Sequence, residues 1–315
     1  MEYKVIDGKG IIPDGTTEIG KSAFKGCTSL QSIEIPDSVT RINYSAFSGC
    51  NNLTSITVSK NNPKYKSINN CILTKDGKIL ILCRNHNIPD SVTIIGDFAF
   101  KGYTSLQSIV IPDSVTEIGD EAFRDCTSLQ SIEIPDSVTK IKSHAFEGCT
   151  SLQSIVIPDR VTTIDSTAFK GCNNLTSIIV SKNNPKYEST NNCMLTKGGK
   201  ELVLCRSHNI PDGVTTIGSA AFDGCTSFQS IVIPDSVTSI DSGAFSNCSG
   251  LQSITITTPE KEPDLSRERI EYLLQALSEY SKEFFLRVPI GCGYAYRHYP
   301  AFKGKFIEIT ADIDA

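Results

Sequence analysis

Short apolar segments alternate with polar ones along most of the chain. Within Leu106–Ile111 the aliphatic residues stand at relative positions 1, 4 and 6, and the alternation at its end is typical of a short β-strand with one buried face. Pro112 ends this strand, because proline has no amide hydrogen for a sheet ladder. Val115 and Ile118 form a second short apolar pair, and we predict that Ala122-Phe123 is a buried plug on a short helical turn.

The dipeptide Ala-Phe gives the period of this pattern. Successive copies are 23 residues apart, except for two gaps of 53 residues. A single coil, meaning one turn of the repeat, cannot bury its apolar side alone, so stacked neighbours must supply the core. The pattern therefore predicts a repeat solenoid of about ten coils, mainly β with short helical turns. The copies are Ala23-Phe24, Ala46-Phe47, Ala99-Phe100, Ala122-Phe123, Ala145-Phe146, Ala168-Phe169, Ala221-Phe222 and Ala244-Phe245.

Each long gap contains an enlarged coil, near residues 59–88 and 181–210. The surrounding segments 51–96 and 173–218 are near copies of each other at an offset of 122 residues, which indicates that a block of several repeats was duplicated. Strand-like runs flank a turn signal in each copy, Asp76-Gly77 in the first and Gly198-Gly199 in the second, and this pattern predicts a short-loop hairpin. We expect both hairpins to project from the coil and to add binding contacts.

The two ends of the chain depart from the repeat. Residues 1–10, with a turn at Asp7-Gly8, are predicted to cap the N-terminal end, and the solenoid is predicted to span residues 11–258. Residues 259–315 are predicted to form a C-terminal helix and cap, because an uncapped last coil exposes its apolar side and an open sheet edge. One amphipathic helix is indicated there by apolar residues at i, i+3, i+4 and i+7. These are Ile270, Leu273, Leu274 and Leu277.

The recurring pattern L-x-S-I-x-I-P-x-S-V-x-x-I-x-x-x-A-F-x-x-C closely resembles the BspA-like, or treponemal-type, leucine-rich repeat family. The resemblance covers Ile11 to about Ile256, and the order Val-Pro-x-Gly…Ala-Tyr…Pro-x-Phe near the C-terminus is similar to the C-terminal cap of this family. It implies a curved leucine-rich-repeat solenoid, a right-handed superhelix. It also implies a non-enzymatic, adhesin-like protein at the cell surface that binds host proteins or other cells.

Composition narrows the class of partner. With 30 basic and 35 acidic residues, the chain has a net charge of −5, so it lacks the basic face that nucleic-acid binding requires. No apolar run approaches the roughly 20 residues of a membrane-spanning helix, so we expect no membrane span. The N-terminus lacks an export signal, so we expect a cytoplasmic protein if the chain is complete, and a surface or secreted protein if a signal was removed.

Seven of the twelve cysteines fall at one repeat position, where Tyr103 takes the place of cysteine in a further repeat. A position that accepts tyrosine has no cross-linking requirement, so we interpret these cysteines as small buried hydrophobes. They are Cys27, Cys50, Cys126, Cys149, Cys172, Cys225 and Cys248.

Four further cysteines flank the two hairpins: Cys71, Cys83, Cys193 and Cys205. A histidine follows each pair, His86 or His208, in the pattern Cys-Arg-x-His. Free thiols are the favoured interpretation, with a disulfide across each hairpin and a zinc site as alternatives, although a structural zinc site needs a fourth ligand.

No catalytic constellation is evident, because Cys-His pairs in a duplicated block are a poor candidate for an active site and no phosphate loop or hydrolase motif occurs. His144 and His298 are expected to be solvated or packed. We predict no enzymatic activity, no cofactor and no metal.

The strand alternation also predicts an exposed face. If the first, fourth and sixth residues of each strand point inward, a serine column and a more variable column face outward, and the variable column can encode binding preference. We expect this face to be the concave side and to bind a protein or glycan, although its β-branched residues also suit a strand for propensity alone. An intracellular protein–protein interaction module is the alternative, favoured by the missing signal and the unpaired cysteines. The proposed binding residues are Ser108, Val110, Ser131, Glu133, Ser154, Val156, Ser177, Ile179, Ser230 and Val232.

Overall fold

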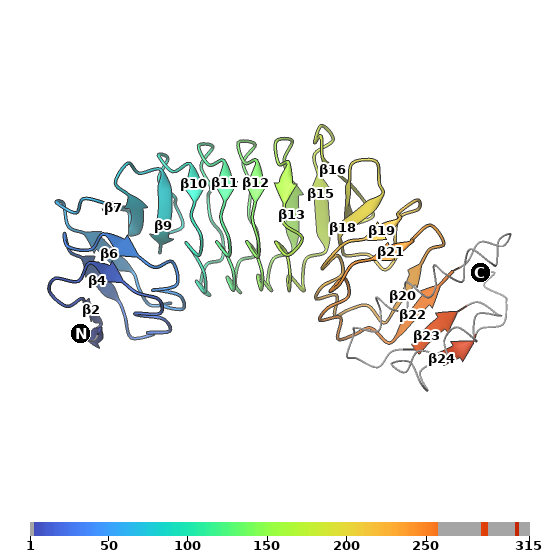
Figure 1. The fold of residues 1–315 in the computed structure, drawn as a ribbon, viewed down its shortest axis with the longest axis horizontal. Helices are drawn as coiled ribbons and strands as arrows, with labels where there is room; N and C mark the ends of the chain where they lie inside the picture. Colours follow the sequence, from blue (N-terminus) through green and yellow to red (C-terminus); the bar gives the residue numbers. More distant parts are fainter. Residues whose placement is uncertain (1–2, 258–284, 289–305, 309–315) are drawn as a thin grey trace. The chain divides into compact units, whose positions relative to one another are not determined.

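The computed structural model describes residues 3–257, 285–288 and 306–308, and the chain divides into two compact units. Unit 1 comprises Met1–Leu175 and Ser181–Pro185, and unit 2 comprises Thr176–Val180 and Lys186–Ala315. Both units are built from short strands joined by turns (Figure 1), in a β-solenoid of about 11 turns where the sequence suggested about ten. The solenoid prediction is therefore confirmed.

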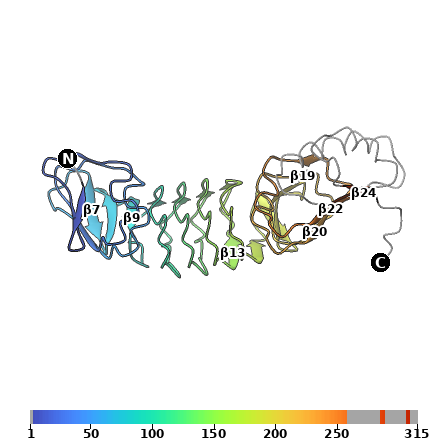
Figure 2. The ribbon, with the colours of Figure 1, turned by 90° about the horizontal axis from the view of Figure 1, so that it is seen from below.

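Unit 1 contains three groups of strands. Its sheets have the orders β1-β2-β4-β6, β3-β5 and β14-β12-β11-β10-β9-β8-β7, and the coils from β9 to β13 stack side by side (Figures 1 and 2). The strands are β1 (Lys4–Ile6), β2 (Lys9–Ile11), β3 (Glu18–Ile19), β4 (Ser32–Ile35), β5 (Arg41–Ile42), β6 (Ser55–Val58), β7 (Tyr65–Ile68), β8 (Cys71–Thr74), β9 (Ile79–Cys83), β10 (Ile94–Ile95), β11 (Glu117–Ile118), β12 (Lys140–Ile141), β13 (Ser154–Ile157) and β14 (Thr163–Ile164).

Unit 2 repeats much of this arrangement. Its two sheets have the orders β16-β17-β18-β19-β21 and β20-β22-β23-β24. The strands are β15 (Ser177–Val180), β16 (Tyr187–Thr190), β17 (Cys193–Thr196), β18 (Glu201–Cys205), β19 (Thr216–Ile217), β20 (Ser230–Ile233), β21 (Ser239–Ile240), β22 (Ser253–Ile256), β23 (Phe285–Val288) and β24 (Phe306–Glu308). The amphipathic helix expected around residues 270–277 lies outside the described residues.

Neighbouring coils pair in parallel and in the register of the repeat. Ser32 of β4 lies opposite Ser55 of β6, and Ser230 of β20 lies opposite Ser253 of β22, each one 23-residue period away. Equivalent residues therefore lie above one another, and each column of the sequence pattern becomes a column on the structure. At the N-terminal end of unit 1, β1 and β2 form an antiparallel hairpin around Asp7-Gly8, and β2 pairs with β4.

The Ala-Phe dipeptides are buried plugs, as predicted, but the predicted helical turns are wrong: the described residues contain no helix. The amide of Phe123 donates to the carbonyl of Ala145 in the next coil, 2.8 Å away, and so makes no bond within its own segment. Glu121, two residues earlier, has a φ of 52°, in the left-handed region that interrupts a right-handed helix. Successive turns that bond across coils thus replace the helix.

Phenylalanine rings form the centre of each stack. Phe100, Phe123 and Phe146 are completely buried, and successive centroids are 4.9 and 5.3 Å apart with interplanar angles of 7° and 1°. In unit 2, Phe222 and Phe245 stack at 5.0 Å. Because each ring contacts the ring of the neighbouring coil, the aromatic column joins coils that are far apart in sequence.

The enlarged coils are three-stranded. In unit 1, β7, β8 and β9 form two successive antiparallel hairpins, and β9 then pairs in parallel with β10. The first turn is Asn69-Asn70, whose φ values of 51° and 58° are those of a tight hairpin turn. Ile72 and Leu73 of β8 are completely buried, so the hairpin strands belong to the core. The expectation that these hairpins project from the solenoid is wrong for their strands.

Candidate binding surface

In each unit, we call the side of the coils that carries the predicted binding residues the strand face. The prediction that the residues alternating with them along the strands point inward is confirmed, since Ile109, Ile155 and Ile178 are no more than 5% exposed. In unit 1, Val110 and Val156 are 67% and 49% exposed; in unit 2, Ile179 and Val232 are 50% and 46% exposed. The remaining predicted residues are Ser108, Ser131, Glu133, Ser154 and Ser230, which are exposed, and Ser177, which is half-buried.

A groove of about 860 Å³ opens on this face of unit 1. Residues 109–114 and 133–137 line it, together with Asp90 and Arg160. Its lining carries the carboxylates of Glu133, Asp90 and two further aspartates, against the single guanidinium of Arg160, so the groove is acidic. The sequence pattern did not reveal this groove, because it predicts that neighbouring coils pair regularly along their strands, and such pairing would leave no opening.

The backbone explains the opening. In the regular part of unit 1, β4 and β6 pair over four successive residues. At the groove, the amide of Gln130 donates to the carbonyl of Gln107 at 3.0 Å, but regular pairing stops there. Within the part of the chain that the structure describes, the amides of Ile132 and Ile134 donate to no partner. The groove therefore lies where regular strand pairing between neighbouring coils is interrupted.

The hairpin cysteines form two disulfides, Cys71–Cys83 in unit 1 and Cys193–Cys205 in unit 2. The favoured interpretation, free thiols, is thus wrong, because the hairpin register places Cys71 directly opposite Cys83 on β8 and β9. Among the described residues, no group of three or more His, Cys, Asp or Glu side chains lies close enough to hold a metal ion. His86 instead places Nδ1 3.2 Å from the carbonyl oxygen of Ser108.

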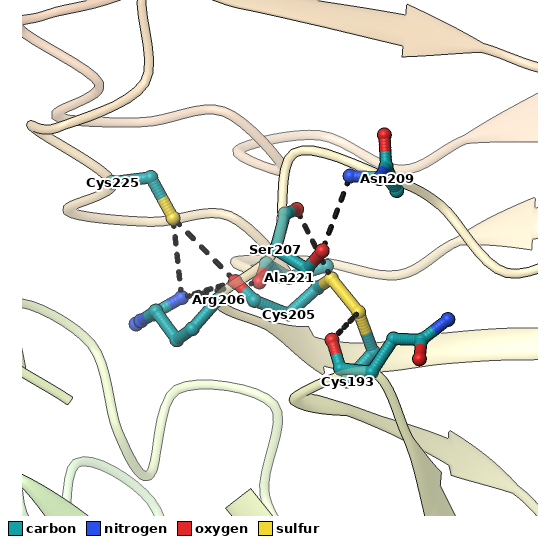
Figure 3. The surroundings of a disulfide bond; sticks show 8 residues. Cys193, Cys205, Arg206, Ser207, Asn209, Ala221 and Cys225 are labelled. Carbon is teal, nitrogen blue, oxygen red and sulfur yellow. Dashed lines mark hydrogen bonds between the residues drawn. A yellow bond between two sulfur atoms is a disulfide. The ribbon is translucent and has the colours of Figure 1, made fainter. Parts of the chain in front are cut away.

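An arginine follows each disulfide, buried in unit 1 and half-buried in unit 2. Arg84 donates to the carbonyls of Cys83 and Phe47 at 2.9 and 3.1 Å, and its guanidinium lies 5.1 Å from the centre of the Tyr103 ring. In unit 2, Arg206 Nη1 lies 3.5 Å from the sulfur of Cys225, the residue that corresponds to Tyr103 (Figure 3). We call the seven cysteines that share one repeat position the ladder cysteines. Tyr103 takes the place of a ladder cysteine where its ring packs on the buried guanidinium of Arg84.

The ladder cysteines of the described residues are free thiols, and all except Cys27 are buried. Burial raises the pKa of Cys50 to about 11 and that of Cys126 and Cys248 to about 12. Thiols with such pKa values are protonated at neutral pH and are poor nucleophiles. Of the isolated histidines, His144 places Nδ1 2.9 Å from Glu147, and His298 lies outside the described residues.

The family comparison agrees with this geometry. The sequence matches the family described as "BspA type Leucine rich repeat region (6 copies)" over residues 9–79, 81–195 and 202–264. Proteins of this kind are generally non-catalytic repeat scaffolds. The comparison with curated proteins gives no match. No helix among the described residues has the length and hydrophobicity to cross a membrane.

Two solved bacterial proteins are similar to this chain. A leucine-rich repeat protein from Eubacterium ventriosum ATCC 27560 is 26% identical, with a TM-score of 0.52, over 81% of this chain and 66% of that one. A leucine-rich cell surface protein from Faecalibacterium prausnitzii A2-165 is 28% identical, with a TM-score of 0.45, over 79% of this chain and 59% of that one. This chain therefore spans less than two thirds of each of these relatives.

Proposed function

Because the chain belongs to the BspA-type leucine-rich repeat family, we propose that it is a non-enzymatic binding scaffold that contacts another protein at a cell surface. The observation that carries this proposal is the exposure of Val110, 67%, beside an open groove. An aliphatic side chain exposed to that extent costs free energy in water, and a partner that covers it recovers that cost.

The groove favours a protein over a glycan at this face. Its open strand backbone can pair with an extended segment of a partner, which is the mode of recognition called β-augmentation. The four carboxylates of its lining favour a segment that carries lysine or arginine. The partner we infer is therefore a protein with an exposed, basic, extended segment.

The disulfides support a location outside the cytosol. Cys71–Cys83 and Cys193–Cys205 persist in oxidising compartments and are rare in reducing ones. The seven free thiols among the described residues are the observation that favours the alternative, an intracellular interaction module. However, burial of six of these thiols protects them from oxidants, so they are compatible with an oxidising environment as well.

The location is tested by mild protease treatment of intact source cells, followed by immunodetection. We expect the protein to be cleaved on intact cells. Full protection on intact cells, with cleavage after lysis as the control, would contradict the cell-surface proposal and favour the intracellular module.

The binding face is tested with Val110→Asp and Val156→Asp combined in the full chain. Binding to immobilised host extracellular proteins is expected to weaken at least about tenfold, because covering each new carboxylate removes its hydration without a partner. Ile6→Asp is the matched control, since Ile6 is 54% exposed on β1 but does not line the groove. Unchanged binding by the double variant would rule out the strand face.

A further inference from the structure

A second cavity in unit 1 shares no residue with the strand-face groove. It has a volume of about 340 Å³, near the lower end of the range for small-molecule sites. Apolar side chains of β5, β9 and β10 form much of its lining, and polar side chains and one tyrosine complete it. The lining residues used below are Ile42, Tyr44, Ile79, Asp97, Glu117 and Lys142.

The cavity lies where the enlarged coil interrupts a ladder of short strands. On this side of unit 1, β5 pairs with β3, whereas β9 and β10 belong to a separate sheet. The amide of Ile42 on β5 donates to the hydroxyl of Tyr65, 3.1 Å away, and so satisfies its hydrogen bond without a neighbouring strand. A gap is therefore left between β5 and the β9-β10 pair, and its position follows from the three-stranded coil.

Tyr44 provides an aromatic wall for this cavity. Its ring stacks on that of Phe98, with centroids 4.4 Å apart and an interplanar angle of 16°. Stacking covers one face of the Tyr44 ring, and Tyr44 remains 53% exposed. Phe98 is held in turn by the ammonium of Lys101, 4.7 Å from its ring centre. The exposed ring is therefore held in one orientation before any ligand arrives.

Hydrogen-bonding groups complete the lining. Asp97 accepts a bond from the amide of Asp120 through Oδ1, and its second oxygen has no partner among the described residues. Lys142 donates to Glu117 at 2.7 Å, and the Lys142 side chain is 39% exposed, so its ammonium has donors to spare. The site thus combines an aromatic face, an apolar floor, free carboxylate oxygens and a free donor.

The duplication inside the chain provides a comparison for these residues. Positions that serve the fold are kept at the offset of 122 residues: Ile42 corresponds to Ile164 and Leu80 to Leu202. Ile42 and Leu80 line the cavity and are kept, whereas three other lining residues and Phe98, which stacks on Tyr44, change. Tyr44, Ile79, Asp97 and Phe98 correspond to Ser166, Glu201, Ser219 and Ala220.

The backbone conformation of Phe98 supports the same conclusion. Its φ is 63°, and Ala220 at the corresponding position has a φ of 58°. A left-handed conformation is unfavourable for a large side chain and is better suited to small or polar residues. The fold therefore requires this backbone conformation but not an aromatic residue, so the stacking contact of Phe98 with Tyr44 is a local feature of this cavity.

From this cavity we propose a carbohydrate site that binds one pyranose ring of a glycan. A pyranose has an apolar face of C–H groups, which fits the exposed Tyr44 ring, and an edge of hydroxyl groups. Those hydroxyls donate to the carboxylates of Asp97 and Glu117 and accept from Lys142. This site is separate from the strand face, so it extends the proposed protein-binding function to a second class of partner.

The absence of tryptophan from the chain gives a direct test. Tyr44→Trp keeps an aromatic wall and introduces a single tryptophan, whose emission then reports on this cavity alone. We expect titration of the full chain with glucose, galactose, mannose and N-acetylglucosamine to produce a saturable emission change with at least one sugar. Adding Phe98→Ala should weaken that response at least fivefold, because the introduced indole ring then lacks the stacking partner that fixes its orientation.

A glycan array with the unmodified protein provides the second measurement. Tyr44→Ala is expected to lower binding to the recognised glycans at least tenfold, with an unchanged urea unfolding midpoint as the check on folding. Ser166→Ala, at the corresponding position of the second copy, and the Val110/Val156 variant should leave glycan binding unchanged. The proposal is overturned if no sugar changes the tryptophan emission and no glycan is retained, or if Tyr44→Ala binds as the unmodified protein does.

Discussion

The sulfur of Cys126 lies 3.2 Å from the carbonyl oxygen of Phe100, which is 26 residues earlier and in the preceding coil. Cys149 makes the same contact with Phe123 in unit 1, and Cys248 makes it with Phe222 in unit 2. The repeated cysteine is therefore a side-chain donor between neighbouring coils as well as a small apolar residue. This explains its recurrence without a disulfide or a metal.

Cys126→Ala should lower the free energy of unfolding by about 1–2 kcal/mol, because it removes a buried sulfur and its hydrogen bond. Urea unfolding followed by circular dichroism measures the change. Cys27→Ala is the matched control, since Cys27 holds the same repeat position but is only partly buried. Equal losses in the two variants would contradict a specific role for the buried contact.

Alkaline pH should weaken the fold through the same thiols. Burial raises the pKa of Cys126 from its ordinary value of 9.0 to about 12. Below pH 9 the thiol is protonated in both states and its stabilisation is complete; as pH rises from 9 towards 12, the unfolded chain loses the proton first and stability falls. The urea midpoint should therefore decrease between pH 8 and pH 11. Cys126→Ala should reduce the slope, and an unchanged slope would argue against this origin.

Removing the first disulfide should lower the free energy of unfolding by about 3 kcal/mol, the loop-entropy value for a short closed loop. Cys71 and Cys83 are 12 residues apart. The combined variant Cys71→Ala and Cys83→Ala is compared with the parent protein with and without a phosphine reductant. The reductant should lower the parent's midpoint further than the variant's, because one of the two disulfides is already absent. Identical midpoints for parent and variant without reductant would refute this prediction.

Asn62 anchors the enlarged coil of unit 1. Its side-chain amide donates to the carbonyls of Pro36 and Val39 at 2.7 and 2.9 Å, and its oxygen accepts from the amides of Lys64 and Tyr65. Replacing this buried group leaves four backbone groups without their partner.

Asn62→Ala should therefore destabilise the chain by about 3 kcal/mol in urea unfolding. The adjacent Asn61 is exposed, so Asn61→Ala should change stability by less than about 0.5 kcal/mol. A similar small effect at both positions would show that the amide contacts do not hold the coil.

Several features were predictable because they depend on local periodicity. The 23-residue spacing identified the buried Ala-Phe dipeptides, and alternation placed Ile109 inside and Val110 outside. The Asp7-Gly8 turn followed from backbone preferences of those two residues, and both have positive φ. These inferences require only that each coil buries one face against its neighbours.

Other features depended on contacts between coils. The predicted helical turns do not form, because the amide of Phe123 donates to the carbonyl of Ala145 in another coil. The disulfides form because the register of the hairpin strands brings Cys71 opposite Cys83 and Cys193 opposite Cys205, which sequence spacing alone left open.

The sequence by itself determined the repeat, its core positions and its family, because stacking translates one local pattern into columns of buried side chains. The tertiary structure alone decided where that stacking is interrupted, namely at the groove near Val110 and the cavity beside Tyr44. Interruptions arise when neighbouring coils differ in length or lose strand pairing, and this depends on the packing of residues distant in sequence. The candidate binding sites lie at those interruptions, where backbone and side chains keep groups available for a partner.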